Sequence, residues 1–299
     1  MTISRRRFIT ISAAAMGVGL PSHARTWRGV ALGADVSITL HSQQSNTDQI
    51  ITRAVSHIRR LEGEFSIYQP QSRISSLNHT GKTANSFDFN ALLNEVNEIH
   101  ALTNGLFDPT IQPLWQAYAN DPNLPVDAEK QALLRVGWRH VQNTPDHLRF
   151  ARAGMAMTLN GIAQGFVTDQ ISTLLHNAGF PDATVNIGEY RTGTNPVKIA
   201  IGGSDSAITL SNAAIATSAP SALMLNGHTG HILHPKRGAI PSVWQSVSVV
   251  AKRASIADGI STALCLADDL SLAQRLVQTG VIQRCILIDK HGKITTLVG

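Results

Sequence analysis

Segments typical of helices and strands follow one another in an irregular order, and this order constrains the fold more than any other feature of the chain. Apolar residues recur at helical spacing in residues 48–61, 89–103, 127–136, 165–178, 256–266 and 270–279. Short apolar or alternating runs predict strands at residues 29–40, 184–187, 197–201, 207–210, 231–233 and 247–251, and a terminal hairpin at 284–289 and 293–298. Because the segments do not alternate regularly as in βαβ units, we expect a single α+β domain of mixed sheets with packed helices.

The first 24 residues have the composition of an export signal. Arg5 and Arg6 precede an apolar run at residues 9–20, and small residues follow it. This pattern predicts a twin-arginine signal peptide at residues 1–24, a single mature domain at residues 25–299, and a periplasmic protein exported by the twin-arginine route. A membrane anchor or a basic helix is the alternative, although the run is short for a membrane span.

The charge of the chain argues against nucleic acid as a partner. The formal net charge is +5, and removing the three arginines of the predicted signal leaves +2. Lys and Arg do not cluster with aromatic residues in the way that nucleic-acid-binding surfaces require. We therefore expect no nucleic-acid partner.

The two cysteines lie among apolar residues. Cys265 and Cys285 are expected to pack as small hydrophobic side chains. A disulfide between them is the alternative in an oxidising compartment.

A carboxylate and a hydroxyl lie one helical turn apart near the C-terminal end of the chain. Asp258 and Thr262 are four residues apart, so on a helix their side chains meet on one face. Oxygen ligands of this kind are the ones that Mg²⁺ prefers. The structural alternative is an Asp that caps the start of the helix and an incidental Thr.

A glycine-containing turn precedes the predicted helix at residues 165–178. Gly161 and Gly165 remove side-chain bulk where the chain enters this helix, so backbone amides and the positive helix end could face a phosphate. Such turns are common and usually structural.

Three further side chains admit both a chemical and a structural interpretation. His231 titrates near neutral pH and could accept a proton from an attacking hydroxyl, although a lone His in an apolar strand is more often structural. Tyr68 could lie against a flavin or adenine ring or at the edge of the core. Asp108 precedes a proline and could merely fix a turn.

Five sequence blocks in a fixed order give the chain a specific resemblance. They are SIYQPQSRISSLN at 66–78, GLFDPTIQPLW at 105–115, LNGIAQGFVTD at 159–169, HILHPKRG at 231–238 and ADGISTAL at 257–264. In this order the blocks resemble the ApbE family of FAD:protein FMN transferases, from about residue 27 to the C-terminus. The resemblance implies an ApbE-like, T-fold-related domain.

The resemblance also implies a reaction and a set of site residues. A threonine hydroxyl of a partner flavoprotein, which could be anchored in a membrane, would attack FAD, take up FMN and release AMP. Mg²⁺ would be held by Asp258, Thr262 and a main-chain carbonyl at Ala163 or Gly161, and His231 or Asp258 would help to remove the proton. FAD would contact Tyr68, Ser72, Asn78, Phe107, Asp108, Asn160, Gly161, Gly165, Asp169, Thr217, Ser218 and His231.

Three positions depart from the family pattern. His234 replaces the common Asp of HIxDP, Glu189 follows a single glycine instead of two, and Ala219 replaces a glycine. These features resemble the exported branch associated with nitrous oxide reductase maturation. They also keep two alternatives open, namely hydrolysis of FAD to FMN and AMP, and a non-catalytic flavin-binding assembly factor.

His231 and His234 are expected on one strand. Residues three apart on a strand point to opposite faces, so only one of the two imidazoles should reach the FAD pocket. The family pattern favours His231.

Overall fold

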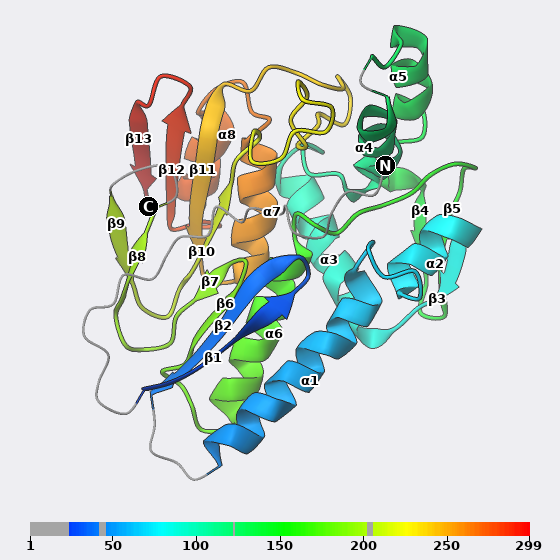
Figure 1. Ribbon diagram of the computed structural model, residues 1–299. Helices are drawn as coiled ribbons and strands as arrows, with labels where there is room; N and C mark the ends of the chain where they lie inside the picture. The colour runs from blue at the N-terminus through cyan, green and yellow to red at the C-terminus, as the bar shows by residue number, and fades with distance from the viewer. Residues whose placement is uncertain (1–23, 42–45, 122, 202–205) are drawn as a thin grey trace.

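The computed structural model describes residues 24–41, 46–121, 123–201 and 206–299. They form one α+β domain, as expected (Figure 1). Residues 1–23, which hold nearly all of the predicted signal peptide, lie outside the described part. Within that part, no helix combines the length and apolarity needed to cross a membrane.

An eight-stranded antiparallel sheet forms the centre of the domain (Figure 1). Across the sheet the strands are β1 (Ala24–Ala31), β2 (Ala34–His41), β6 (Thr184–Ile187), β7 (Tyr190–Arg191), β10 (Ala214–Ser218), β11 (Trp244–Ala251), β12 (Arg284–Asp289) and β13 (Ile294–Val298). The expected terminal hairpin is confirmed as β12 and β13.

The expected single strand at residues 29–40 is wrong. The segment belongs to the β1–β2 hairpin, whose two-residue turn places Leu32 at φ 50° and Gly33 at φ 79°. Positive φ at both turn residues matches the twist of the flanking strands. Leu32 is an unusual residue at such a position, and for that reason the turn is hard to recognise in the sequence.

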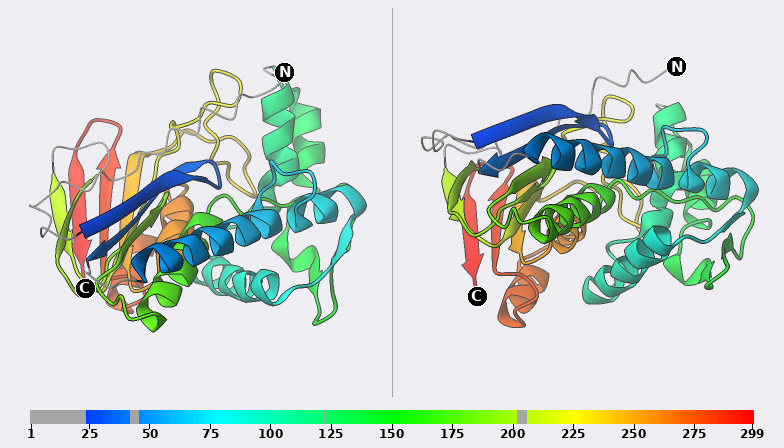
Figure 2. Two further views of the ribbon diagram at one scale, coloured as in Figure 1. Left: turned by 60° about the horizontal axis from the view of Figure 1, so that its bottom comes forward. Right: turned by 90° about the horizontal axis from the view of Figure 1, so that it is seen from below.

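One face of the sheet is covered by helices. Figures 1 and 2 show α1 (Thr47–Phe65), α6 (Ala163–Asn177) and α7 (Ala254–Leu264) layered on this side, with α3 (Phe87–Leu102) behind α7 and α8 (Ser271–Gln278) near β12. The predicted apolar stripes of these helices make the main core. Phe65 at its centre packs against the rings of Phe89 and Phe166, each with a centroid separation of 5.7 Å.

The opposite face of the sheet is covered by a small separate hairpin. β8 (Val197–Ala200) and β9 (Ala207–Leu210) pair with each other and bury Ile199 and Ile208 against Ile215 and Val250 of the large sheet. Both faces of the central strands are therefore buried, which explains why residues 246–251 of β11 are buried without interruption.

Several short elements form the side of the molecule on which α4 and α5 project (Figure 1). They are α2 (Arg73–Thr80), β3 (Lys82–Ala84), η1 (Pro109–Ile111), α4 (Gln112–Asn120), α5 (Val126–Leu133), η2 (Trp138–His140), β4 (Val141–Asn143) and β5 (His147–Phe150). Of these, only α5 was expected.

The expected strand at residues 231–233 is also wrong. Between β10 and β11 the chain forms a long irregular segment that contains only the isolated bridges Met224–Gly230 and His234–Gly238. Gly230 lies directly against Pro220, because a Cβ built on it would be 2.5 Å from the Pro220 carbonyl oxygen. Apolar residues in this segment reflect packing onto α4 and α5 and not strand pairing.

Both cysteines are buried free thiols, as expected from their apolar neighbours in the sequence. Burial raises the pKa of each thiol, to about 12 for Cys285.

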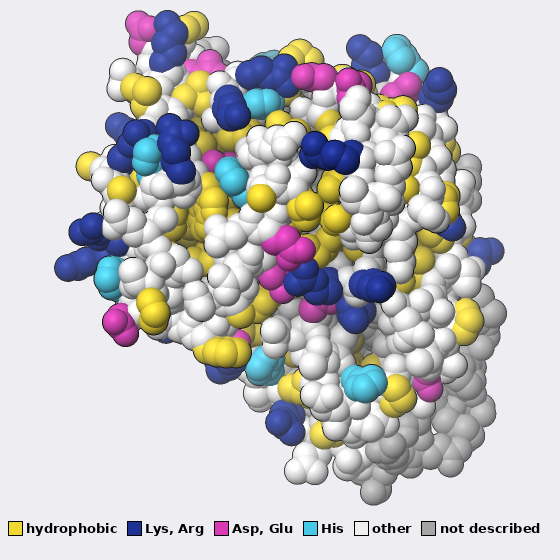
Figure 3. All heavy atoms as spheres, turned by 180° about the vertical axis from the view of Figure 1, so that it is seen from behind, with side chains coloured by type: hydrophobic (Ala, Val, Ile, Leu, Met, Phe, Trp, Pro, Cys, Tyr) yellow, Lys and Arg dark blue, Asp and Glu magenta, His cyan; other side chains and the backbone are white. Residues whose placement is uncertain are grey.

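On the face drawn in Figure 3, Lys and Arg side chains form several separate groups with acidic side chains among them. That face has no continuous basic stripe of the kind that follows a nucleic-acid backbone.

Candidate active site

Helix α7 provides the carboxylate and the hydroxyl of the predicted metal pair. Asp258 and Thr262 lie one turn apart on α7 and line the same pocket, as their spacing predicted. Asp258 is only 3% exposed. A carboxylate held at such a depth needs strong partners or a cation.

The start of α7 is capped by a residue from a different helix. Asp169 of α6 accepts hydrogen bonds from the backbone N–H groups of Ala254 at 2.9 Å and Ser255 at 3.0 Å. Its carboxylate also pairs with Arg191 at 2.8 Å. Asp169 is absent from the pocket lining, and its hydrogen bonds position the start of α7.

The turn before α6 lies along the same face of α7. The N–H of Gly165 donates to Asp258 Oδ2 at 3.1 Å, and a Cβ built on Gly161 would lie 3.0 Å from Thr262 Oγ1. Gly161 and Ala163, either of which could offer a main-chain carbonyl to a metal, both line the pocket. They therefore belong to the same site as Asp258 and Thr262.

Gly165 has a structural role that differs from the expected one. A Cβ at this position would lie 2.4 Å from the Ala254 carbonyl oxygen, so only glycine permits α6 and α7 to cross this closely. Its amide serves Asp258, and Gly165 does not line the pocket. The structure therefore gives Gly165 a role in the crossing of the two helices.

A second buried carboxylate faces Asp258. Glu189 lies in the turn between β6 and β7, and its Oε2 accepts the N–H of Thr217 at 3.2 Å. Burial, followed by the repulsion of Asp258, raises the pKa of Glu189 well above its usual range. Burial raises the pKa of Asp258 to about 7, against the opposing effect of the Gly165 hydrogen bond. Two unneutralised carboxylates at this depth favour a proton or a cation between them.

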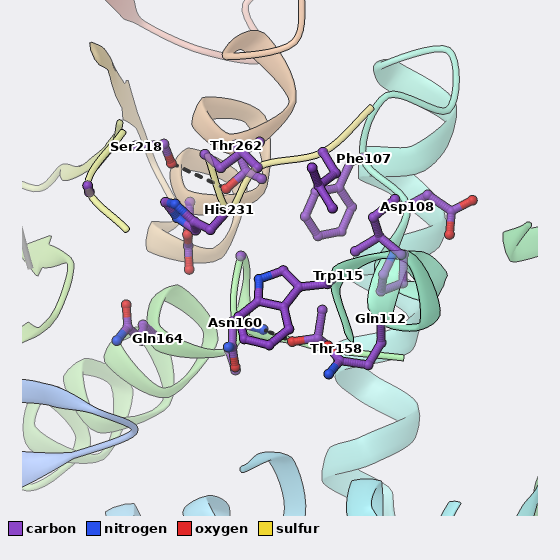
Figure 4. Close-up of a pocket in the computed structure, with 18 of the residues that line it drawn as sticks. Phe107, Asp108, Gln112, Trp115, Thr158, Asn160, Gln164, Ser218, His231 and Thr262 are labelled. Carbon is purple, nitrogen blue, oxygen red and sulfur yellow. Dashed lines mark hydrogen bonds between the residues drawn. The ribbon is translucent and has the colours of Figure 1, made fainter. Parts of the chain in front are cut away.

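Hydroxyl groups of β10 and α7 meet beside this acidic pair. Ser218 Oγ lies 2.8 Å from Ser261 Oγ and 3.2 Å from Thr262 Oγ1, and the contact with Thr262 is drawn in Figure 4. Thr217 Oγ1 lies 2.8 Å from Ser248 Oγ on β11. The expected pocket positions of Thr217 and Ser218 agree with the lining.

His231 is held in one tautomer by the irregular segment that carries it. Its Nδ1 lies 3.2 Å from the carbonyl oxygens of both Pro220 and Leu223. Carbonyl oxygens only accept hydrogen bonds, so Nδ1 carries the hydrogen and Nε2 is the nitrogen that can accept a proton. Burial lowers the pKa of His231, and the two backbone contacts oppose that shift.

Only one of the two histidines reaches the pocket, although the expected strand is absent. His231 lines the pocket with Asp258, whereas His234 is buried beside a separate groove. His234 Nδ1 accepts the N–H groups of Lys236 and Arg237 at 3.0 and 3.1 Å. It fixes the tight turn at residues 234–238, a role that the usual Asp of the motif can also fill.

Aromatic side chains form another part of the pocket wall (Figure 4). Phe107 and Trp115 face the pocket from the segment around η1 and α4, and Asn160 lies beside the Trp115 indole in the view of Figure 4. Asn160 Nδ2 donates to the hydroxyl of Tyr68 at 3.3 Å. Burial raises the pKa of Tyr68 to about 12, so this hydroxyl stays neutral.

Three residues expected to contact FAD use their side chains in hydrogen bonds within the chain. Ser72 caps α2 by accepting the Ser75 N–H, and Asn78 bonds both backbone groups of Met157, each at 2.8 Å. Neither lines the pocket. Asp108 does line it, but its carboxylate accepts the N–H groups of Thr110 and Trp138 and points away from the pocket centre in Figure 4.

Several lining residues were missed by sequence reasoning. These are Gln112, Trp115, Thr158, Gln164 and Glu189. Trp115 ends the second of the five blocks and follows Ile111, another lining residue, at helical spacing, so an amphipathic reading of 111–115 could have found it. The others become neighbours only through tertiary contacts.

The donor set fits a hard divalent cation. Among the described residues, no three His, Cys, Asp or Glu side chains converge as a metal cluster. An ion at Asp258 would therefore be completed by hydroxyl and carbonyl oxygens, which Thr262 and the turn at Gly161 and Ala163 offer in the same pocket. Glu189 and Asp258 supply the negative charge.

The family model for the ApbE family matches residues 32–283. The chain belongs to the ApbE family. It is 25% identical over 261 residues to a FAD:protein FMN transferase from Chlamydia pneumoniae, covering 80% of this chain and 81% of that one.

Solved structures of ApbE proteins share the fold. The flavin transferase ApbE from Vibrio cholerae superposes with a TM-score of 0.79 at 21% identity, covering 93% of this chain and 98% of that chain. The apo flavinyl transferase ApbE from Pseudomonas stutzeri has a TM-score of 0.79 at 21% identity, with 92% and 94% covered. The ApbE protein from Thermotoga maritima has a TM-score of 0.76 at 23% identity, with 91% and 96% covered.

Proposed function

We propose that this ApbE-family protein transfers the FMN part of FAD to a threonine hydroxyl of a partner flavoprotein. The observation that carries the proposal is the meeting, in one pocket, of a tautomer-fixed His231 with the buried acidic residue Asp258 and the hydroxyl of Thr262. The name of the Chlamydia pneumoniae relative supports the same reaction.

In the proposed reaction one phosphoanhydride bond is exchanged for one phosphoester bond. The threonine oxygen attacks the phosphorus on the FMN side of FAD, and the bond to the AMP phosphate breaks. AMP leaves with the bridging oxygen, and the threonine proton passes to a base. The protein mainly has to orient the pyrophosphate and hold the attacking hydroxyl in line.

His231 is the proposed base. Its Nδ1 hydrogen is committed to the Pro220 and Leu223 carbonyls, so Nε2 offers a lone pair without any prior rotation of the ring. Burial lowers the pKa of His231, which keeps the imidazole neutral and able to accept a proton near pH 7. Asp258 is the alternative base.

Mg²⁺ is the proposed metal, held by Asp258, Thr262 and a carbonyl of Gly161 or Ala163. When bound, Mg²⁺ neutralises charge on the pyrophosphate oxygens. The two carboxylates of Glu189 and Asp258 give this end of the pocket an affinity for cations, whereas the aromatic wall of Phe107 and Trp115 suits a flat ring system. In the proposal, the polar wall lies at the pyrophosphate of the dinucleotide and the aromatic wall lies at one of its ring systems.

The proposal is tested by the intact mass of an acceptor domain. A candidate flavoprotein domain is incubated with the enzyme, FAD and Mg²⁺, and a matched acceptor with its target Thr replaced by Val serves as the control. A mass gain equal to one FMN on the Thr acceptor alone supports transfer. Free FMN and AMP without a mass gain indicate FAD hydrolysis, and unchanged FAD indicates a binding role.

We also propose that the protein works in the periplasm, after export by the twin-arginine route. The basis is the pair Arg5-Arg6 ahead of the apolar run, which lies outside the described residues. An acceptor on the same side of the membrane, whether free or membrane-anchored, is then the partner to test.

A further inference from the structure

Three hydroxyl groups form a short hydrogen-bonded chain between β10 and α7, and we call it the hydroxyl chain. Its members are Ser218 at the end of β10 and Ser261 and Thr262 on α7. Ser218 Oγ lies 2.8 Å from Ser261 Oγ and 3.2 Å from Thr262 Oγ1. Ser261 is fully buried, and its hydroxyl donates to the main-chain oxygen of Asp258 at 2.9 Å.

The hydrogen-bond direction along this chain follows from counting protons. Each hydroxyl has one hydrogen to donate. Ser261 donates its hydrogen to the Asp258 carbonyl, so Ser218 is the donor in its contact with Ser261. Ser218 then has no hydrogen left, and Thr262 must be the donor in the contact between Thr262 and Ser218.

Thr262 therefore differs from the threonines of this protein that bond back along their own helix, and in this it is like Thr168 of α6, which donates to the Glu189 carbonyl at 3.3 Å. Thr52, Thr103 and Thr279 each donate to the carbonyl four residues earlier, at 2.7–2.9 Å. Such back-bonding is the common local choice for a helical Thr. At Thr262 the hydroxyl contact runs to Ser218 on the neighbouring strand, and the carbonyl four residues earlier, that of Asp258, accepts from Ser261.

We propose that Ser218 is a positioning residue that accepts the Thr262 hydroxyl proton and so directs the Thr262 lone pairs to the cation. This inference rests on the proposed function, because it assumes that Thr262 is a ligand. A hydroxyl ligand gives a lone pair to the ion, and its hydrogen then needs an acceptor elsewhere. Partners that orient metal ligands in this way typically contribute 10- to 100-fold to metal affinity.

The same chain links both ligands of the proposed site. Ser261 ties the backbone at Asp258 to Ser218, and Ser218 ties Thr262 to β10. The spacing of the two ligands is therefore fixed by the sheet as well as by α7. A Ser218 variant should change metal binding without removing any ligand.

The test is direct Mn²⁺ binding to the purified protein, measured by the electron paramagnetic resonance signal of free Mn²⁺ with FAD present. Ser218→Ala is expected to raise the Mn²⁺ dissociation constant by about 10- to 100-fold. Ser218→Thr keeps a hydroxyl and is expected to retain binding. Turnover of Ser218→Ala should recover at high Mg²⁺, with the KM for FAD nearly unchanged.

Ser248→Ala is the matched control. Ser248 is a buried serine whose hydroxyl contacts Thr217 Oγ1 at 2.8 Å, next to the hydroxyl chain but outside it. This variant should bind Mn²⁺ as the wild type does. If Ser218→Ala does not fold, Ser218→Cys gives the same comparison, because sulfur is a weak acceptor of similar size.

Two results separate failure of this inference from failure of the proposed function. If Thr262→Ala weakens Mn²⁺ binding and a folded Ser218→Ala or Ser218→Cys variant does not, the Ser218 role is wrong and the metal site stands. If Asp258→Ala and Thr262→Ala both bind Mn²⁺ normally, the metal site itself is wrong, and the Ser218 role falls with it. Adding Ser218→Ala to Thr262→Ala should produce no further weakening.

Discussion

Replacing Asp258 by Asn should stabilise the metal-free protein at high pH while removing metal-dependent activity. Asp258 is 3% exposed, and burial raises its pKa from 3.8 to about 7. The folded protein therefore binds this proton more tightly than the unfolded chain does. Stability from Asp258 is fully present below about pH 4 and is lost as the pH rises through about 7.

The size of the effect follows from the same pKa. Holding this carboxylate ionised above pH 7 costs about 4 kcal/mol relative to pH 4. The amide introduced by Asp258→Asn does not titrate and keeps an oxygen for the Gly165 N–H, so this pH-dependent cost disappears. The free energy of unfolding of the variant minus that of the wild type should therefore increase by about 4 kcal/mol between pH 4 and pH 8.

The assay is urea unfolding in EDTA, followed by tryptophan fluorescence at several pH values. The prediction concerns only how the difference in unfolding free energy between the variant and the wild type changes with pH. Any pH-independent cost of packing the introduced amide therefore cancels. With Mg²⁺ added, the wild type should gain more stability than Asp258→Asn, because the variant lacks the carboxylate proposed to bind the cation. A difference in unfolding free energy that stays constant from pH 4 to pH 8 would refute the reasoning.

Three further outcomes are expected. His231→Ala should lower kcat by about 10²- to 10⁴-fold with a smaller change in FAD binding, whereas His234→Ala should affect mainly stability, and equal small losses of kcat would contradict the base assignment. Asp169→Ala should lower the free energy of unfolding by about 1–3 kcal/mol through loss of the α7 cap, seen as a shifted urea midpoint, and an unchanged midpoint would argue against that role. Replacing Arg5 and Arg6 with Lys should leave the precursor in the cytoplasm on cell fractionation, and an unchanged periplasmic yield would favour the general secretory route.

Sequence patterns predicted the elements whose apolar stripes face the main core. The stripe of α1 and the alternation of β2 are set by burial on one side, which periodicity detects. The strand expected at 231–233 failed because its apolar residues are buried from an irregular segment, Leu233 against α4 and α5 and Ile232 against the main core. Composition alone cannot distinguish this burial from that of a strand.

For the site, motif order predicted which residues share the pocket more securely than it predicted the role of each residue. Asp258 and Thr262 meet because their spacing matches one helical turn, which is visible in any sequence. Gly165 and Asp169 were assigned to the cofactor, yet both serve the crossing of α6 and α7. A glycine that makes room for a ligand and one that makes room for a second helix look identical until the tertiary contact is known.

The reciprocal contacts between α6 and α7 have a consequence for local unfolding. The amides of Gly165, Ala254 and Ser255 lie in the first turns of their helices, where amides usually exchange with solvent early. Here each donates to a carboxylate of the other helix, Gly165 to Asp258 and the other two to Asp169. Neither helix start can open alone, so the two helix starts should exchange hydrogen as a single cooperative unit.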